Sequence, residues 1–354
     1  MVKDYLTKKH VLLTIMQVDI IGGGVAGLST AISLKKRDEH ISVSLYERHP
    51  TIAYNHDGRR CGEAFFSEIN NQWIPKGKSV FNNIHQVEII IGNKTYYEKF
   101  SPTNSPTFML NKPAFIDQLA KQAEEYEVNI QTNARISKIN QLSADVIIDA
   151  SGCPSIIKKS LGLNQGLKGL TYQETLTNCN FFDPHRIIIY YFGKVGYYWI
   201  FPRNPDTKEV NVGVGLLETR QISLPKLLHS FMNKMNITGN PVYYAGGLIP
   251  LGLQTPFQKN NILFVGDAGV GTFPYLGEGI RRALISGELA AECIVKNKID
   301  SYSTEIMKRF YLWDFIGKFG IKASKTASLI SEDAMFFLLH RYFDFVNSQY
   351  TIKY

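Results

Sequence analysis

Residues 59–66, RRCGEAFF, bring a thiol, a carboxyl group and two cations together within five consecutive positions. A thiol or a carboxylic acid can deliver a proton to a substrate, and a nearby cation favours the deprotonated form of either group. Arg59 and Arg60 would push Cys61 towards the thiolate if they face it, whereas a thiol of ordinary pKa, about 8.5, stays protonated at neutral pH. Two further interpretations stay open: Cys61 as a small buried apolar residue, and the arginines as solvated charges or phosphate contacts.

The composition is that of a globular protein that can bury a large core, with 44% apolar and 20% charged residues among 354. The four cysteines lie far apart without a CxxC pair, so we expect free thiols and a cytoplasmic location: Cys61, Cys153, Cys179 and Cys293. The apolar run at 11–16 is too short to span a bilayer, and no convincing signal peptide is present. Met16 is an alternative start. The net charge of +8 suggests an anionic partner such as phosphate groups or lipid headgroups.

A glycine motif opens the chain's first β-α-β unit. An apolar strand at 17–21 leads into Gly22, Gly24 and Gly27 in GxGxxG spacing, then a helical pattern at 28–38 and a second strand at 41–49. The first glycine allows a tight turn, the second admits a pyrophosphate at the helix N-terminus, and the third lets the helix pack on the strand. Glu47 can hold a ribose 2′-hydroxyl, whereas the adjacent Arg48 would favour a 2′-phosphate. We therefore predict a dinucleotide site.

Two later turns identify the dinucleotide as FAD. The apolar strand ILFV at 262–265 ends at Gly266-Asp267, and the helix that follows carries small residues at Ala283, Gly287, Ala290 and Ala291. A nicotinamide dehydrogenase has no use for this second glycine-acid turn, whereas FAD is long enough to need it for its ribityl and flavin end. DVIIDASGCPS at 145–155 adds a third strand and turn, which would close the adenine side.

These motifs together resemble a known family. GGGVAG, the ASG turn and GDAG…GEGI…SGELAA are similar to the p-hydroxybenzoate hydroxylase-like FAD-dependent oxidoreductases. CGEA at 61–64 and YYWIFPRNPDTKEVNVGVG at 197–215 resemble the geranylgeranyl reductase branch, the digeranylgeranylglycerophospholipid reductase-like proteins. The resemblance covers about residues 17–295. It implies saturation of isolated C=C bonds in a geranylgeranyl-type prenyl lipid, such as those of archaeal membranes, by hydride from reduced flavin plus a proton.

The fold expected from these patterns is α/β with an α+β second domain. We predict a discontinuous Rossmann-like FAD-binding domain over 1–80, 107–165 and 256–296, an antiparallel-sheet substrate domain over 81–106 and 166–255, and a C-terminal helical region over 297–354. The predicted cofactor contacts are Gly22, Gly24, Val25, Ala26, Gly27, Glu47, Arg48, Arg60, Cys61, Gly62, Ala150, Ser151, Gly152, Gly266, Asp267, Gly277, Gly279 and Ile280.

The substrate side is predicted from β-rich runs between 166 and 250, with PDTKE as a hairpin turn. Strand alternation places Tyr197, Trp199 and Phe201 on one face, and Tyr198 and Ile200 on the other. The aromatic face either packs against a helix or, because small glycines face it, lines an apolar groove for the lipid. The predicted substrate contacts are Tyr197, Trp199, Phe201, Gly213, Gly215 and Pro274.

An isolated alkene must receive a proton as well as a hydride. Because no carbonyl polarises such a bond, the transition state should carry carbocation character, which π faces and a carboxylate can stabilise. In the family that this chain resembles, the segment after the second strand passes the flavin ring. Cys61, Glu63 and Tyr197 are therefore the candidate catalytic residues, and the sequence does not choose among them as the proton donor.

The source of electrons and several rival functions stay open. Only one GxGxxG is present, so the reductant must be NAD(P)H that docks transiently or a carrier such as ferredoxin. No histidine cluster has metal-ligand spacing, and we expect no metal. The rivals are an FAD-dependent monooxygenase of an aromatic or apolar small molecule, a non-redox flavin-dependent prenyl cyclase, and a non-enzymatic carrier.

The segment from Lys296 onward is helical in pattern, with Ile306, Phe310 and Trp313 on one stripe. Residues 296–326 contain seven basic and three acidic residues, a net charge of +4, which is half the excess of the whole chain. Such a segment either rests on an anionic membrane surface or closes the substrate domain with a solvated outer face. No nucleic-acid partner is expected.

Overall fold

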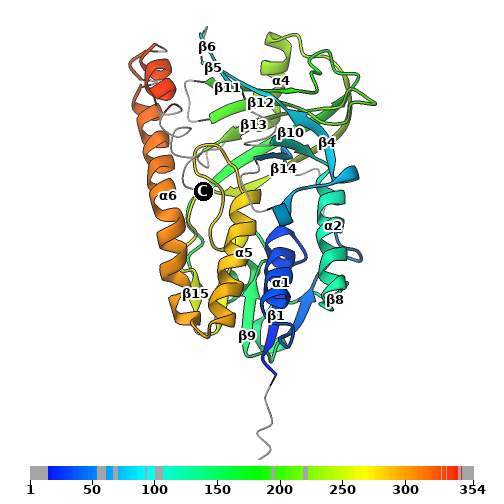
Figure 1. Ribbon diagram of the computed structural model, residues 1–354. Coiled ribbons are helices and arrows are strands. Elements are labelled where there is room, and N and C mark those ends of the chain that lie inside the picture. Colours follow the sequence, from blue (N-terminus) through cyan, green and yellow to red (C-terminus); the bar gives the residue numbers. More distant parts are fainter. Residues whose placement is uncertain are drawn as a thin grey trace, which may run out of the picture.

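The computed structural model describes residues 15–53, 61–66, 71–91, 94–99, 107–192, 196–217, 222–327, 329–331, 333–341 and 344. Two large sheets, each carrying its own helices, build the described part of the molecule (Figure 1). The α/β fold with an α+β second half, predicted from the sequence, is confirmed.

The first sheet is Rossmann-like, with six strands in the order β15-β16-β9-β1-β2-β8. Its parallel strands are β1 (Gln17–Ile21), β2 (Ser42–Tyr46), β8 (Asn129–Gln131), β9 (Val146–Asp149) and β16 (Ile262–Phe264), and β15 (Gln258–Lys259) runs antiparallel at the edge. The central strands are apolar because both faces of a parallel sheet are covered. Ile20 belongs to the core on one face, and Ile21 to the core on the other.

Three helices cover one face of this sheet side by side: α1 (Val25–Arg37), α2 (Lys112–Glu125) and α5 (Ile280–Val295) (Figure 1). α1 and α5 approach closely because α5 carries a glycine at the crossing. A Cβ on Gly287 would lie 2.5 Å from Ser29 Oγ and 2.8 Å from Thr30 Oγ1. The short α3 (Ile156–Ser160) brings Ile157 into the core of the opposite face. The packing of the small residues predicted on the late helix is therefore confirmed at Gly287.

The second sheet has seven strands in the order β14-β10-β13-β12-β11-β5-β6. They are β5 (Gln86–Ile91), β6 (Lys94–Lys99), β10 (Lys168–Thr177), β11 (Arg186–Phe192), β12 (Gly196–Pro202), β13 (Val210–Leu216) and β14 (Asn240–Pro250). All neighbouring pairs are antiparallel except β5 with β11, which are parallel. The expected antiparallel sheet is thus present, with one parallel pair that the sequence did not reveal.

The two faces of β12 follow the predicted alternation. Tyr197 and Trp199 pack in one core with residues of α6 (Tyr302–Ala327), and Tyr198 and Ile200 pack in the core on the other face. That second core includes Phe231 of α4 (Leu224–Lys234), whose ring stacks on Tyr198 with centroids 4.0 Å apart.

A small third sheet carries the chain between the two large ones. It contains β3 (Ala64–Phe66), β7 (Thr107–Leu110) and β4 (Val80–Ile84), in that order. Cys61, Gly62 and Glu63 immediately precede β3, so their position is set by this junction. Short 3-10 turns complete the fold: η2 (Asn71–Trp73), η3 (Gly77–Ser79), η4 (Ile139–Gln141), η5 (Gly266–Ala268) and η6 (Ile299–Ser301).

The C-terminal region is helical, as predicted. α6 runs along one outer side of the molecule, and residues 333–341 form a further helical segment (Figure 1). Ile306, Phe310 and Trp313 are all buried on the inner face of α6, which confirms the predicted stripe. Within the described residues, no helix is both long and apolar enough to cross a membrane.

Candidate active site

The first glycine turn is shaped by contacts between backbone atoms. Gly22 has φ +109°, and a Cβ there would lie 2.5 Å from the Ala150 carbonyl oxygen. A Cβ on Gly27 would lie 2.0 Å from the Gly22 carbonyl oxygen, whereas a Cβ on Gly24 would meet no atom within 4 Å. The first and third glycines therefore serve the packing of the fold, and the second faces open space, as a pyrophosphate site requires.

The end of β2 closes this turn. Glu47 Oε2 accepts a hydrogen bond from Gly23 N at 2.8 Å, and Oε1 accepts one from His49 N at 3.0 Å. Among the residues that the structure describes, no side chain caps the N-terminus of α1, where Val25 and Ala26 lie, so its first N–H groups are available to an anion. Arg48 is exposed at the surface, and Arg60 lies outside the described residues.

The third and second motifs meet beside the glycine turn. Ala150 N donates to Ile21 O at 3.0 Å, and Ser151 Oγ accepts from Ile156 N at 3.1 Å. Gly152, Gly266 and Gly277 all have positive φ. Burial raises the pKa of the Cys153 thiol to about 11, and the charge of Asp267 contributes to this rise. The turn that contains Cys153 and the Gly266-Asp267 turn therefore lie within electrostatic range of each other.

Asp267 is the carboxylate expected to bind the flavin end of the cofactor. Burial raises its pKa, and the charges of Lys112 and Arg282 oppose that rise. Its Oδ1 would lie 3.7 Å from a Cβ on Gly279, the N-cap of α5, immediately before Ile280. In the part of the chain that the structure describes, no donor hydrogen-bonds to this carboxylate, so it is available to a ligand hydroxyl. Arg282 holds the loop between Asp267 and α5 in place, because it donates hydrogen bonds to Gly271 O at 3.1 Å and to Val270 O at 2.8 Å.

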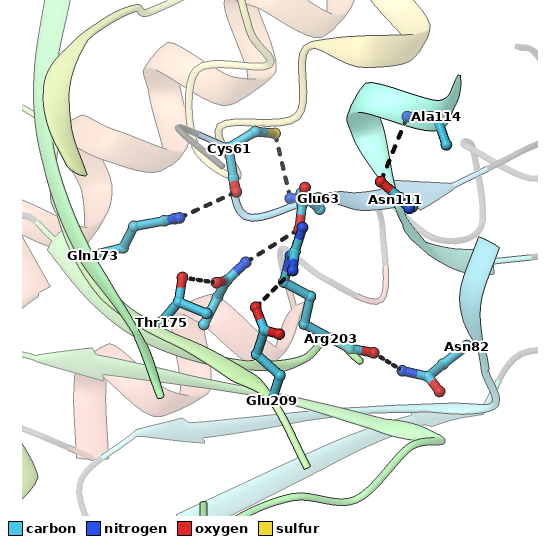
Figure 2. Close-up of polar contacts among 10 residues, drawn as sticks. Cys61, Glu63, Asn82, Asn111, Ala114, Gln173, Thr175, Arg203 and Glu209 are labelled. Carbon is cyan, nitrogen blue, oxygen red and sulfur yellow. Dashed lines mark hydrogen bonds and ion pairs between the residues drawn. The ribbon is translucent and has the colours of Figure 1, made fainter. Parts of the chain in front are cut away.

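The Cys61–Glu63 segment lies between the two large sheets. Cys61 Sγ accepts a hydrogen bond from Glu63 N at 3.3 Å, and Cys61 O accepts one from Gln173 Nε2 at 3.3 Å (Figure 2). Glu63 has φ +69°, a backbone conformation that costs a non-glycine residue on the order of 1 kcal/mol or more. Strain of this kind persists where surrounding contacts fix the residue, and here they fix Glu63 in the interior.

Glu63 is part of a buried charge cluster that also contains Arg203 and Glu209 (Figure 2). Arg203 Nε donates to Glu63 Oε2 at 2.6 Å, and Arg203 NH1 donates to Glu209 Oε1 at 2.6 Å. The guanidinium also lies 4.6 Å from the centroid of the Phe81 ring. Asn211 Nδ2 lies 3.5 Å from Glu63 Oε2, and Asn211 Oδ1 accepts from Thr175 Oγ1 at 2.7 Å.

The cluster contains two carboxyl groups and one guanidinium. Glu63 is 0% exposed, and burial raises the pKa of its carboxyl against the opposing charges of Arg203 and Lys112. The same two carboxylates raise the pKa of Arg203 although burial acts in the opposite direction. Arg203 is shared between two buried carboxyl groups, so burial and the sharing of this guanidinium favour the protonated form of Glu63, and the charges of Arg203 and Lys112 oppose it.

The aromatic row of β12 packs on the Cys61–Glu63 segment. A Cβ on Gly62 would lie 2.9 Å from the Phe201 ring and 3.8 Å from Trp199 Nε1. Trp199 is buried, and among the described residues no acceptor pairs with its Nε1–H. Tyr197, Trp199 and Phe201 follow one another with ring centroids 6.0 and 6.2 Å apart.

The groove expected above the glycines of β13 is occupied by a side chain. The Trp199 indole lies over Gly213, where a Cβ would come within 2.1 Å of the ring, and it also reaches Gly215 at 3.5 Å. The expectation that both glycines leave an open groove is therefore wrong at Gly213, because the large indole lies flat against the neighbouring strand. The glycines instead give Trp199 its room.

Tyr197 and Pro274 hold the loop before α5. The Tyr197 hydroxyl donates to Leu276 O at 2.8 Å, and burial holds its pKa well above the usual range. The Pro274 ring packs between Gly252 and Gly317 of α6. Beyond Tyr197, a small apolar cavity of about 10 Å³ lies under the C-terminal helices; its lining residues are Tyr191, Phe192, Gly196, Leu217, Tyr275, Ser324 and Met335.

Sequence reasoning missed four residues of this centre: Lys112, Arg203, Glu209 and Asn211. The charge of Lys112 acts on both Glu63 and Asp267, so this residue lies within electrostatic range of both carboxyl groups. Arg203 and Glu209 could have been noticed in the sequence: Arg203 follows the apolar segment that ends in FP, and Glu209 directly precedes VNVG, and a charge is unusual beside such buried strands. Lys112 had none, because it follows a strand of a different sheet.

Comparisons with known proteins match both halves of this centre. The geranylgeranyl reductase catalytic domain matches residues 169–248, which contain β11 to β13 and most of β10 and β14, and an NAD(P)-binding Rossmann-like domain matches residues 20–68. The predicted resemblance to the geranylgeranyl reductase family is confirmed. The contact between Glu63 and Arg203 joins the two matched regions.

Relatives and solved structures agree with these domains. The chain is 26% identical to digeranylgeranylglycerophospholipid reductase 3 of Methanosphaera stadtmanae, over 86% of this chain and 85% of the relative. It is 23% identical to digeranylgeranylglycerophospholipid reductase of Sulfolobus acidocaldarius, over 86% and 74%. A geranylgeranyl bacteriochlorophyll reductase-like protein of Thermoplasma acidophilum has the same fold, with a TM-score of 0.78, 22% identity and coverage of 91% and 90%. A flavin-dependent brominase shares it more distantly, with a TM-score of 0.67, 16% identity and coverage of 96% and 92%.

Proposed function

We propose that this protein is an FAD-dependent reductase that saturates isolated C=C bonds of a geranylgeranyl-type prenyl lipid. The observation that carries the proposal is the packing of the β12 aromatic row on Gly62, beside the buried carboxyl of Glu63. The region of Arg203 matches the geranylgeranyl reductase catalytic domain, the region of Glu63 matches an NAD(P)-binding Rossmann-like domain, and relatives over most of the chain are named digeranylgeranylglycerophospholipid reductases.

The residues around the three turns suit FAD. Gly24 and the uncapped start of α1 would take the pyrophosphate, Glu47 the ribose, and Ala150, Ser151 and Gly152 the adenine side. Asp267 and the N-terminus of α5 at Gly277, Gly279 and Ile280 would take the ribityl chain and the flavin. When bound and reduced, FAD supplies the hydride.

Glu63 is our candidate for the proton. Burial raises the pKa of its carboxyl, which favours the protonated form, while Arg203 pairs with both Glu63 and Glu209 and fixes the position of Glu63. Cys61 stays a second candidate, because its thiol lies on the same segment, where Sγ accepts a hydrogen bond from the backbone N–H of Glu63. Tyr197 is assigned to positioning, since its hydroxyl proton is engaged by Leu276 O.

The aromatic row supplies the apolar wall. Tyr197, Trp199 and Phe201 present π faces, which stabilise positive charge developing on an alkene carbon, and they exclude water from it. The Nε1–H of Trp199, which pairs with no acceptor in the described part of the chain, is available to a polar atom of a ligand. Gly213, Gly215 and Pro274 support this wall rather than line it.

The electron donor is proposed to be external, either NAD(P)H that docks transiently or a carrier such as ferredoxin. Anaerobic reduction of the bound flavin, followed by its absorbance, separates these sources. Bleaching by NADPH without a partner protein supports the nucleotide, and bleaching only by reduced ferredoxin supports the carrier.

The function is tested by incubating dithionite-reduced protein with geranylgeranyl glycerolipids and measuring the product by mass spectrometry. The expected product gains two hydrogen atoms for each bond saturated. An unchanged lipid, or an oxygenated product formed with NADPH and O₂, would contradict the proposal and favour a carrier or a monooxygenase. A rearranged lipid of unchanged mass would favour a cyclase.

The role of Glu63 is tested in the same assay. We expect Glu63→Gln to lower the rate of saturation by about a hundredfold or more while flavin remains bound, because a general acid typically contributes that much. Glu88→Gln is the matched control, since Glu88 is also a buried carboxyl paired with an arginine, Arg186, but lies on β5. Equal rates in both variants would remove Glu63 from the mechanism.

A further inference from the structure

The outer face of α6 carries a row of large apolar side chains that point into solvent. Tyr311, Leu312, Phe315 and Phe319 are 55% to 58% exposed, and their spacing places them along one side of the helix over three consecutive turns. Single exposed apolar residues are ordinary, whereas a contiguous row marks an interaction surface. The opposite side of α6 is buried by Ile306, Phe310 and Trp313, so both sides of this helix are apolar.

The row continues past the end of α6. Leu329 and Ile330 follow the helix and are among the most exposed apolar residues of the described chain, and Phe337 is exposed on the segment 333–341. Figure 1 shows this segment at the end of α6, on the same outer side of the molecule.

Basic side chains flank the apolar row. α6 contains five basic residues, Lys308, Arg309, Lys318, Lys322 and Lys325, and two acidic ones, Glu305 and Asp314, for a net charge of +3. Lys308 pairs with Glu305 at 2.7 Å and Lys318 pairs with the buried Asp314 at 2.7 Å, so the excess positive charge of α6 comes from Arg309, Lys322 and Lys325. Lys322 and Lys325 are exposed at the C-terminal end of the row, and Lys308 and Arg309 lie at its beginning.

We propose that this outer face, which we call the α6 surface, docks the protein on an anionic lipid bilayer, with α6 lying in the plane of the membrane. An apolar row bordered by cations is the pattern of a helix that rests at the interface between acyl chains and headgroups. The charges complement acidic lipid headgroups. They disfavour a second copy as occupant, because a two-fold contact through this face would set the cations of one copy near those of the other.

The choice of a lipid surface rests in part on the proposed function. Ser324, on the inner side of α6, and Met335 line the small cavity next to Tyr191 and Tyr275. If the protein acts on a prenyl lipid, docking through the outer side of α6 would place the membrane that holds the substrate on one side of this helix and the cavity on the other. Membrane docking itself requires no turnover and can be measured without substrate.

The test is flotation of the full-length protein with vesicles of phosphatidylglycerol and, separately, of phosphatidylcholine. We expect flotation with the anionic vesicles and little with the neutral ones. The double variant Phe315→Ser/Phe319→Ser should lower the bound fraction at least about tenfold, and Lys322→Gln/Lys325→Gln by roughly fivefold for each lysine. Raising the salt concentration should weaken vesicle binding of the wild type strongly and that of the lysine variant only slightly, because the variant has lost most of the attraction that salt screens.

The matched control is Tyr244→Ser, which removes another exposed aromatic residue, on β14 of the second sheet, and should leave flotation unchanged. Saturation of a detergent-solubilised lipid should be equal in the wild type and in the Phe315→Ser/Phe319→Ser variant, because these residues lie outside the candidate active site. Failure of flotation with normal saturation would overturn the docking proposal alone. Self-association that the phenylalanine variant abolishes, without vesicle binding, would assign the α6 surface to a second copy instead.

Discussion

The two halves of the candidate active site are built from different kinds of contact. In the glycine-turn half, backbone atoms meet backbone atoms, as Gly27 meets the Gly22 carbonyl. In the aromatic half, side chains from distant segments meet one another, as Arg203 reaches Glu63 across 140 positions of the chain. The turn between β1 and α1 is therefore encoded locally, whereas the aromatic half depends on how two sheets come together.

Two glycines make this difference measurable. A Cβ on Gly27 would lie 2.0 Å from a backbone oxygen, and a Cβ on Gly213 would lie 2.1 Å from the Trp199 side chain. The two distances are almost equal, yet only the second neighbour can move by rotating its side chain. Identical substitutions in the two halves should therefore have very different consequences.

The largest effect is expected for Gly27→Ala. Since the Gly22 oxygen belongs to the turn between β1 and α1, relief of the clash would require the helix to move off the sheet. We expect a loss of more than about 4 kcal/mol in the free energy of unfolding, seen as insoluble protein or as a strongly lowered midpoint in urea.

Gly24→Ala is the counterpart within the same turn. Its Cβ would meet no protein atom within 4 Å, so the variant should fold normally. It should nevertheless hold FAD at least about tenfold more weakly, because the methyl group occupies the space left for the pyrophosphate. Normal FAD affinity in this variant would contradict the assignment of Gly24 to the phosphates.

The next largest effect is expected for Arg203→Met, which leaves Glu63 and Glu209 buried without their shared cation. Breaking a buried ion pair from one side typically costs about 3–5 kcal/mol. The loss should be smaller at pH 5 than at pH 8, because protonation neutralises the stranded carboxyl groups. Arg186→Met is the control: Arg186 also binds two acids, Glu88 and Asp183, but its side chain is 38% exposed, and we expect a loss of about 1 kcal/mol or less.

The contrast also explains how much of the structure could be predicted from the sequence. The β1-α1-β2 unit, the late Gly266-Asp267 turn and the two faces of β12 follow from local spacing and alternation, and the structure has all three. The parallel pairing of β5 with β11 could not be predicted, because the sequence of neither strand specifies which distant strand it pairs with. The boundaries of the predicted domains stay a prediction.

The side-chain cluster was only half visible in the sequence. Cys61 and Glu63 were singled out for their chemistry, but their partners Arg203 and Gln173 depend on how β10 and the β12–β13 turn meet the β3 junction. The same holds for Trp199, whose place over Gly213 depends on its rotamer and on the neighbouring strand. Local pattern predicts which face a side chain is on, and long-range packing decides what it touches there.

A pH effect of intermediate size is expected for Glu63→Gln. Burial raises the folded-state pKa of Glu63 above its ordinary value of 4.5, so the folded protein binds this proton more tightly than the unfolded chain. The resulting stability is fully present below pH 4.5 and is lost as the pH rises through the folded-state pKa, at no more than about 1.4 kcal/mol per pH unit. In the Glu63→Gln variant, the free energy of unfolding should therefore decline less between pH 5 and pH 8 than in the wild type. Urea unfolding of both proteins at pH 5, 6, 7 and 8 measures it, and parallel profiles would mean that Glu63 is ionised in the fold.

The smallest effect is expected for Gly213→Ala, in the aromatic half. The methyl group must displace the Trp199 indole, and because a side chain can rotate away, we expect a loss of about 1–2 kcal/mol, far less than for Gly27→Ala. Gly215→Ala is the matched control, since its Cβ would make an ordinary contact of 3.5 Å with the same ring and should leave stability nearly unchanged. Saturation of the lipid should fall in Gly213→Ala beyond what its stability loss explains, because the displaced ring belongs to the apolar wall. If Gly213→Ala proved as damaging to folding as Gly27→Ala, the position of Trp199 would be fixed as rigidly as the backbone of the glycine turn, and the distinction between the two halves would fail.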